Sequence, residues 1–369
     1  MKRISILMTA AIIATGCGKT DDKMNILIGT YGENIYVYSF DQGSLEFKEA
    51  GKAEARNASY ALTGIDAQGS IYAVSETGDG SGAYSFASDG NIGLTAEKRQ
   101  TGADPCFVLL HKGYMMTADY SGGSISVFPI EEDGSISDLV QRAVFHGSGP
   151  VTSRQEGSHI HQLKAVPGHD DLILASDLGA DRIRLLRFSS EGKDILNHVC
   201  DIECPSGSGP RHMEFSKDGR MLYCIAELSG EVLVYEMTAE SQKGEVPSFT
   251  LVQRIQADEV NAGGSADIHI HPDGTLLYTS HRLDNDGISI FRIKQDGTLE
   301  KTGYARTARH PRNFMITPDG NHLLVACRDD KVIQVFAIEK DGGLTLKPSV
   351  LRFDSDMPSS VTIFQRKSI

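Results

Sequence analysis

The sequence predicts a seven-bladed β-propeller, and three observations support this fold class. A four-strand pattern recurs with a period of roughly 40 to 50 residues, which is typical of propellers and solenoids. Turns rich in Gly, Asp and Ser separate the predicted strands. Helical periodicity of apolar residues is not sustained anywhere in the chain. We therefore expect an all-β protein whose four-stranded antiparallel sheets surround a central channel.

Composition describes an ordinary globular protein. Of the 369 residues, 40% are hydrophobic and 23% are charged, and the formal net charge is -13. Nucleic acids and anionic membrane surfaces require a basic face, so we expect neither as a partner. An anionic small molecule would need a local basic pocket.

The N-terminus has the pattern of a secretory signal. Lys2 and Arg3 precede an apolar run over residues 4–13, and Ala-Thr-Gly-Cys follows at residues 14–17. Small residues before a cysteine resemble a bacterial lipoprotein processing site, so we expect Cys17 to carry a lipid. The alternative is an ordinary secretory signal with an incidental cysteine.

This interpretation divides the chain into three parts. Residues 1–17 are the expected signal peptide and lipobox, residues 18–24 a polar tether, and residues 25–366 the propeller domain. The predicted location is the cell envelope, on the periplasmic or surface face, with membrane attachment only through the lipid.

The remaining five cysteines are odd in number, so at least one is unpaired. They are scattered through apolar segments, which favours buried thiols: Cys106, Cys200, Cys204, Cys224 and Cys327. A disulfide between Cys200 and Cys204 is the alternative. Because no CxxC or histidine spacing occurs, we expect no metal site and no cofactor.

The repeat is clearest in residues 104–148, which contain four short apolar strands separated by turns. The same order begins again near five other positions: Ala58, His159, Pro210, Ser265 and Pro311. Turns such as Pro272-Asp273-Gly274 join first and second strands and are hairpin signals. Six complete units result.

The two ends of the chain supply the seventh unit. Residues 25–31, 35–40 and 45–50 match second, third and fourth strands, whereas the first strand is found at residues 359–364. We therefore expect the C-terminal strand to complete the N-terminal blade, because closure removes the free edges of an open array. The alternatives are a pair of β-sandwiches or a solenoid.

In a propeller the starts of first strands and the ends of second strands lie at the same mouth of the channel. Ionisable residues gather at those positions: His159, His161, Arg211, His212 and Arg312 at the starts, and Glu76, Asp119, Asp177, Glu227, His281, Arg282 and Arg328 at the ends. Such a cluster indicates either ion pairs between blades or a ligand site. Arginines and histidines in an acidic protein favour an anion-binding pocket. We expect the long loop 147–157, which carries Arg154, to form part of its wall.

Several motifs together resemble one known family. They are Ile28-Gly29-Thr30-Tyr31, Asp104-Pro105-Cys106, Ala118-Asp119-Tyr120, Arg154-Gln155 with His159 and His161, Gly209-Pro210-Arg211-His212, and Pro311-Arg312-Asn313. Over about residues 25–364 the chain resembles the lactonase family of seven-bladed propellers, which includes bacterial 6-phosphogluconolactonase and fungal carboxymuconate-lactonizing enzymes.

The resemblance implies a set of active-site residues. It places the catalytic groups on His161 or His159, Arg211, Glu227 and Arg282, and the choice between the histidines is left open. Candidate substrate-binding residues are Arg154, Asp177, His212, His281 and Arg312. The chain departs from the family where His281 replaces an Asn and where Cys327 replaces an Asn after Ala326.

The expected reaction is hydrolysis of a small-molecule lactone by a monomeric enzyme. Lactone hydrolysis needs a base for water, donors for the oxyanion and a substrate-positioning group. We expect Glu227 or His161 to be the base, Arg211 the oxyanion donor, and Arg282 with Arg312 the binders of a carboxylate or phosphate. Because no Gly-x-Ser-x-Gly motif occurs, direct attack by water is favoured over an acyl-enzyme.

Three alternatives remain open at this stage. A lipoprotein would meet a non-phosphorylated sugar-acid lactone more readily than a phosphorylated metabolite, and a muconate-type lactonizing activity is the second alternative. A noncatalytic propeller that binds glycans or proteins is the third. A calcium ion in the channel is compatible with the carboxylates, although the proposed chemistry does not require it.

Overall fold

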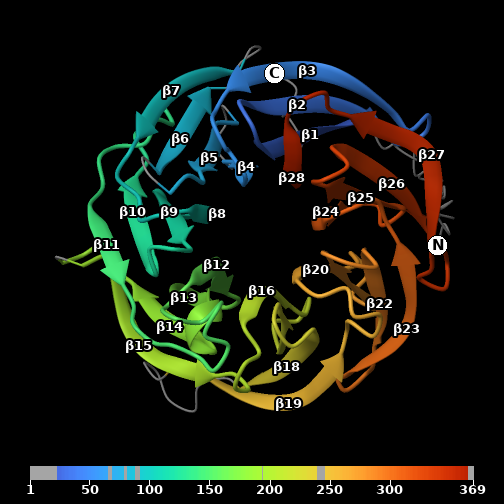
Figure 1. Cartoon of the computed structure of the whole chain (residues 1–369). Helices are drawn as coiled ribbons and strands as arrows, with labels where there is room; N and C mark the ends of the chain where they lie inside the picture. The colour runs from blue at the N-terminus through green and yellow to red at the C-terminus, as the bar shows by residue number, and fades with distance from the viewer. Residues whose placement is uncertain are drawn as a thin grey trace, which may run out of the picture.

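The structure, a computed structural model, describes residues 23–64, 69–78, 81–87, 92–192, 194–238 and 246–364. The expected signal peptide, Cys17 and nearly all of the tether lie outside these residues. The described strands form seven four-stranded antiparallel sheets around a central axis (Figure 1). The predicted seven-bladed propeller is therefore confirmed.

Blades are numbered 1 to 7 along the chain. Blade 1 contains β1 (Lys23–Tyr31), β2 (Asn34–Asp41), β3 (Glu46–Glu54) and β28 (Met357–Phe364). Blade 2 contains β4 (Ala61–Thr63), β5 (Ile71–Ser75), β6 (Gly82–Ala87) and β7 (Gly93–Lys98). Blade 3 contains β8 (Pro105–His111), β9 (Tyr114–Asp119), β10 (Ser124–Pro129) and β11 (Gln141–Val144). Blade 4 contains β12 (Ile160–Val166), β13 (His169–Asp177), β14 (Arg182–Phe188) and β15 (Leu196–Glu203).

The remaining blades follow the same order. Blade 5 contains β16 (Pro210–Phe215), β17 (Met221–Ala226), β18 (Glu231–Thr238) and β19 (Ser248–Gln256). Blade 6 contains β20 (Ser265–Ile270), β21 (Leu276–His281), β22 (Gly287–Ile293) and β23 (Leu299–Arg306). Blade 7 contains β24 (Pro311–Ile316), β25 (His322–Cys327), β26 (Val332–Ile338) and β27 (Leu344–Arg352). A single 3-10 turn, η1 (Leu178–Ala180), follows β13, and no described helix is long and apolar enough to cross a bilayer.

The two ends of the chain close the ring as expected. β28 pairs antiparallel with β1, so that Ile363 lies opposite Ile26 (Figure 1). The buried carboxylate of Asp356, just before β28, accepts hydrogen bonds from Asn34 Nδ2 at 2.9 Å and the Tyr36 hydroxyl at 2.8 Å. Closure therefore combines strand pairing with a side-chain clasp.

Neighbouring blades are packed face to face through apolar side chains. In one cluster Tyr223 of β17 packs with Leu277 and Phe291 of blade 6. The Tyr223 hydroxyl also donates to the carbonyl of Gly297 in the outer hairpin of blade 6, at 2.8 Å. Tyr72 and Tyr278 repeat this tie between other blades. Each blade is thus fixed to the next, and the ring is a stiff support for residues at the channel mouth.

Candidate active site

The inner strands of several blades share one irregularity that positions the candidate site. Their pairing to the second strand skips one residue near the start, and in four blades the skipped residues are Cys106, His161, Arg211 and Arg312. A β-bulge of this kind leaves one residue outside the ladder and re-aims its side chain. These four residues, which we call the bulge positions, are therefore equivalent by structure although their chemistry differs.

A second set of equivalent residues follows directly after the second strands. It comprises Glu76 after β5, Tyr120 after β9, Glu227 after β17 and Arg282 after β21. Together with bulge positions this set encloses a pocket of about 250 Å³, which is lined by Glu76, Cys106, Tyr120, Arg154, His161, Glu227, Arg282 and Arg312. Five residues of the predicted cluster line this pocket, and the others lie outside its lining: the five are Glu76, His161, Glu227, Arg282 and Arg312.

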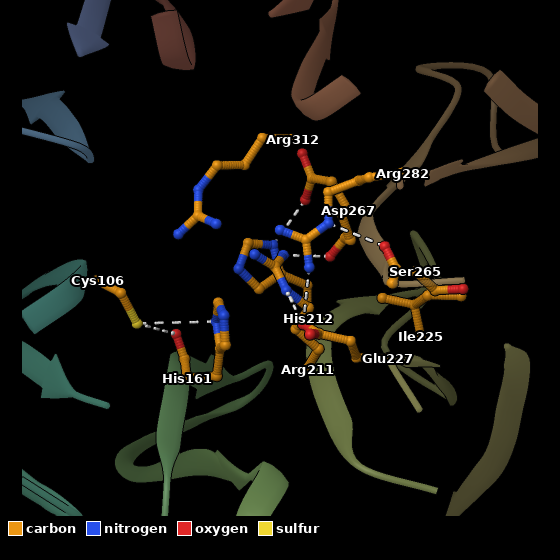
Figure 2. Close-up of polar contacts among 12 residues, drawn as sticks. Cys106, His161, Arg211, His212, Ile225, Glu227, Ser265, Asp267, Arg282 and Arg312 are labelled. Carbon is orange, nitrogen blue, oxygen red and sulfur yellow. Dashed lines mark hydrogen bonds and ion pairs between the residues drawn. The ribbon is translucent and has the colours of Figure 1, made fainter. Parts of the chain in front are cut away.

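Glu227 is the electrostatic centre of this pocket. Its carboxylate accepts from Arg154 Nη2 at 2.6 Å and Arg211 Nε at 2.8 Å, and it lies 3.0 Å from Arg282 Nη2. Figure 2 shows Arg211 and Arg282 converging on it. Burial alone raises the pKa of a carboxyl, but the three arginine charges outweigh it and lower the pKa of Glu227 to about 2. The carboxylate is ionised, and each of its two oxygens is paired with arginine.

Arg211 and Arg282 each contact Glu227 and are also fixed by a main-chain carbonyl. Arg211 is 1% exposed, and its Nη1 donates to the carbonyl of Ala266. Arg282 donates from Nε to the carbonyl of Gly264 at 2.9 Å. Burial lowers the pKa of Arg282 to about 9, so the guanidinium stays protonated at neutral pH. Arg211 contacts Glu227 but does not line the pocket.

Arg312 is held more loosely than the other pocket arginines. Its Nη2 lies 3.6 Å from Glu76 Oε1, and its guanidinium lies over the Tyr31 ring with 5.1 Å to the ring centroid. Glu76 in turn accepts from the Tyr31 hydroxyl at 2.7 Å. Among the described side chains, none accepts a hydrogen bond from the Arg312 guanidinium at a shorter distance than the Glu76 contact. The donors of Arg312 are therefore available to a bound molecule.

His161 is the pocket histidine. The residue is 4% exposed, and its Nε2 has no hydrogen-bond partner among the described residues. Burial, followed by the charges of Arg211 and His212, lowers the pKa of His161 well below its ordinary value. The ring is therefore neutral at physiological pH. It points into the same space as Arg312 (Figure 2).

The structure distinguishes the two candidate histidines. His159 does not line the pocket, because its ring stacks behind Tyr120 with 4.5 Å between centroids. Its Nδ1 is 3.0 Å from the Tyr120 carbonyl, and its Nε2 is 3.2 Å from Glu156 Oε1. Both ring nitrogens are occupied, and His159 supports Tyr120 instead of facing a substrate.

The loop 147–157 forms part of the pocket wall, as the sequence predicted. The fully buried Gln155 anchors it by donating to the carbonyl of Leu178 at 2.9 Å and to Asp181 Oδ1 at 2.7 Å. The neighbouring Arg154 reaches Glu227 and the Tyr120 hydroxyl, the latter at 3.1 Å. The loop is thus a fixed support for Arg154.

Three predicted substrate-binding residues do not line the pocket. Asp177 accepts from the main-chain N–H groups of His159 and Ala180 and from Arg184, so it holds the turn after β13. His281 is fully buried between Ser265 Oγ and Thr279 Oγ1, at 2.8 and 3.0 Å. Both are the last residue of a second strand, one position before the residue that follows the strand. Because side chains alternate between the two faces of a strand, the side chains of Asp177 and His281 point away from the pocket.

His212 is the third such residue. It follows the bulge position Arg211, and its Nδ1 lies 2.7 Å from Asp267 Oδ1 below the pocket. Burial lowers its pKa to about 4, so the ring is neutral. Its ring contacts His161 edge to face at 5.1 Å between centroids. His212 therefore contacts His161 but does not itself line the pocket.

Sequence reasoning did not assign Cys106, Tyr120 and Glu76 to the candidate site. Cys106 and Tyr120 were quoted only as parts of motifs, and Glu76 only as a charge near the mouth. The available signal was their place in the repeat, since Cys106 is equivalent to His161, and Glu76 and Tyr120 are equivalent to Glu227.

Metal-ligand geometry is not found in the described residues. No group of three or more His, Cys, Asp or Glu side chains within them could hold an ion. The five cysteines after Cys17 are free thiols, so the alternative Cys200–Cys204 disulfide is not formed.

Comparison with known proteins agrees with the fold. The family described as "Lactonase, 7-bladed beta-propeller" matches residues 25–363. A 6-phosphogluconolactonase of Bacillus subtilis is 30% identical over 339 residues, which cover 88% of this chain and 94% of the relative. A putative 6-phosphogluconolactonase from Bacteroides fragilis superposes with a TM-score of 0.87 at 36% identity, over 94% of this chain and 99% of the other.

A third similarity is to a protein outside the cytoplasm. The periplasmic gluconolactonase of Pseudomonas aeruginosa superposes with a TM-score of 0.84 at 26% identity, over 94% of this chain and 100% of that one. The family match spans nearly all of the described propeller. This chain belongs to the lactonase family of seven-bladed β-propellers.

Proposed function

We propose that the protein hydrolyses the lactone of a sugar acid by direct attack of water in the Glu227 pocket. The observation that carries this proposal is the pairing, in one pocket, of a neutral histidine with an unoccupied nitrogen and an arginine with available donors. Similarity to 6-phosphogluconolactonases supports the reaction class.

His161 is the general base of the proposed reaction. Its Nε2 takes a proton from water as the water oxygen forms a bond to the lactone carbonyl carbon. The ring C–O bond then breaks, and the leaving oxygen receives that proton, which gives the open hydroxy acid. A low pKa makes His161 a weak base but keeps it unprotonated over the whole physiological range.

Arg312 and Arg282 supply positive charge where the oxyanion develops. Arg312 is the better donor, because Arg282 already contacts Gly264 and Glu227. Arg211, which the sequence indicated as the oxyanion donor, acts in this scheme through Glu227, since its guanidinium is committed to Glu227 and Ala266.

Glu227 serves as the counter-ion in this scheme and not as the base. Both of its oxygens are paired with arginines, and a carboxylate with a pKa of about 2 accepts a proton poorly at neutral pH. By holding three arginines in one geometry, it preorganises the cationic wall of the pocket.

The location of the protein bears on which lactone is its substrate. Secretion and lipid attachment at Cys17 would place the pocket outside the cytoplasm, and the similarity to a periplasmic gluconolactonase supports that location. A non-phosphorylated sugar-acid lactone is then the better candidate. The cationic wall also accommodates the phosphate of 6-phosphogluconolactone, so both lactones belong in the assay.

Turnover of δ-gluconolactone and its 6-phosphate by the purified protein tests this function, with spontaneous opening subtracted at each pH. We expect His161→Gln to lower kcat about 100-fold. His198→Gln is the matched control, because His198 is an exposed histidine on β15. Equal enzymatic rates for wild type and His161→Gln would overturn the site. Absence of turnover with both lactones would overturn the reaction for these substrates.

A further inference from the structure

Cys106 is a pocket residue to which the proposed reaction assigns no role. It occupies the bulge position of β8, one blade before His161, and is 5% exposed. Its sulfur lies 3.8 Å from His161 Nδ1 and 3.4 Å from the His161 carbonyl oxygen (Figure 2). The thiol therefore contacts both the side chain and the main chain of the same histidine.

The direction of these contacts follows from counting hydrogens. A thiol has one proton to donate, and the His161 carbonyl is a nearer acceptor than the carbonyl of Ile160, which lies 3.9 Å away. Burial raises the pKa of Cys106, so the thiol keeps its proton. With that proton directed at a carbonyl, the sulfur presents only lone pairs to Nδ1.

The tautomer of His161 follows from what each of its two ring nitrogens faces. A neutral imidazole carries one N–H, and the hydrogen bond made by one nitrogen decides which of the two holds it. Since Nδ1 faces an acceptor, the proton belongs on Nδ1. Nε2 then carries the free lone pair. Of the two ring nitrogens of His161, Nε2 is the one without a hydrogen-bond partner among the described residues.

We propose that Cys106 is a positioning residue that holds His161 in the Nδ1-protonated tautomer, with the Nε2 lone pair facing the substrate. The inference rests on the proposed role of His161 as the base. Cys106 acts only through His161 and takes no covalent part in the reaction.

Other groups around His161 do not compete for Nδ1. The charges that act on the ring come from Arg211 and His212 of β16, from Arg312 of β24 and from Arg282, which follows β21. Tyr120 meets the ring edge to face at 5.6 Å between centroids. None of these described groups hydrogen-bonds to Nδ1, whereas the sulfur does.

The tautomer can be measured directly by 15N NMR of protein labelled at histidine, with the His161 signals assigned through His161→Gln. We expect wild type to show a protonated Nδ1 and an unprotonated Nε2. Cys106→Ala should move His161 toward a mixture of tautomers, and Cys106→Ser should restore the wild-type pattern, because a hydroxyl also accepts. Cys224→Ala is the matched control, since Cys224 is buried in the blade 5 core.

Kinetics on the same proteins supply the second readout. We expect Cys106→Ala to lower kcat about tenfold with KM unchanged, and Cys106→Ser to recover most of the rate. A protonated Nε2 in wild type, or an unchanged tautomer in Cys106→Ala, would overturn the inference. If the tautomer behaves as expected but His161→Gln keeps full turnover, the proposed base is wrong while the contact stands.

Discussion

Replacing Glu227 by Gln is the sharpest perturbation of the pocket, because it removes one charge and keeps the shape. In the wild type, one 4%-exposed carboxylate is the shared ion-pair partner of Arg154, Arg211 and Arg282. After substitution, the two deeply buried guanidiniums of Arg211 and Arg282 lose their shared counter-ion. An uncompensated buried charge is expensive, so the variant should be less stable at neutral pH.

Two independent routes give a similar magnitude. Removing one partner of a buried ion pair costs about 3 to 5 kcal/mol. Lowering the pKa of Glu227 from 4.5 to about 2 corresponds to roughly 3 kcal/mol of stabilisation by the ionised form. Because the folded-state pKa is depressed, this contribution is present above about pH 4.5 and is lost as the pH falls towards 2.

Urea unfolding between pH 3 and 7 would measure this contribution. The Glu227→Gln protein should lose about 3 kcal/mol at pH 7, and its difference from wild type should shrink at acidic pH. Glu231→Gln is the control, because Glu231 pairs with the exposed Arg254 and should cost about 0.5 kcal/mol or less. A loss below about 1 kcal/mol for Glu227→Gln, or a pH-independent loss, would refute the counter-ion role.

Three further substitutions test the fold and the register. Asp356→Ala should lower the unfolding free energy by about 3 kcal/mol, measured in urea, because it removes the charged acceptor that clasps the closing strands. Gly179→Ala should cost about 1 to 3 kcal/mol and raise KM, because the new Cβ would overlap the carbonyl of Gly157, the last residue of the loop that carries Arg154. Gly93→Ala is its control, since a Cβ there meets no atom within 4 Å and should be neutral. His281→Asn should keep kcat and KM within about twofold of wild type in the lactone assay, because its side chain lies outside the pocket.

The sequence sufficed for the architecture because each repeat carries its own turns and apolar alternation. It also placed His161, Glu227 and Arg282 close together, and the three line one pocket, since strand ends can be read to within one or two residues. That precision is insufficient for side chains. An error of one residue exchanges the two faces of a strand, which is why Asp177 and His281 were expected to bind substrate although they hold turns and strands together.

The bulge explains the other limit of sequence reasoning. It inserts an extra residue into the inner strands, and nothing in the alternation of Pro105, Cys106 and Phe107 announces which residue leaves the ladder. A search for ionisable groups therefore finds Arg211 and Arg312 but passes over Cys106 at the equivalent position. The equivalence becomes visible only when the pairing registers of several blades are aligned.

The position of a residue in the strand pairing also determines whether a substitution between relatives changes a side chain that lines the pocket. His281 and Cys327, where the chain departs from the family pattern, are both the last residue of a second strand and point away from the pocket. His281 is enclosed by two hydroxyls, and Cys327 contacts Gln334 at 3.5 Å within blade 7. Substitutions there change the packing of a blade. A change of substrate would instead require replacement at a bulge position or in the residue that follows a second strand, because those two sets alone supply every pocket-lining residue except Arg154.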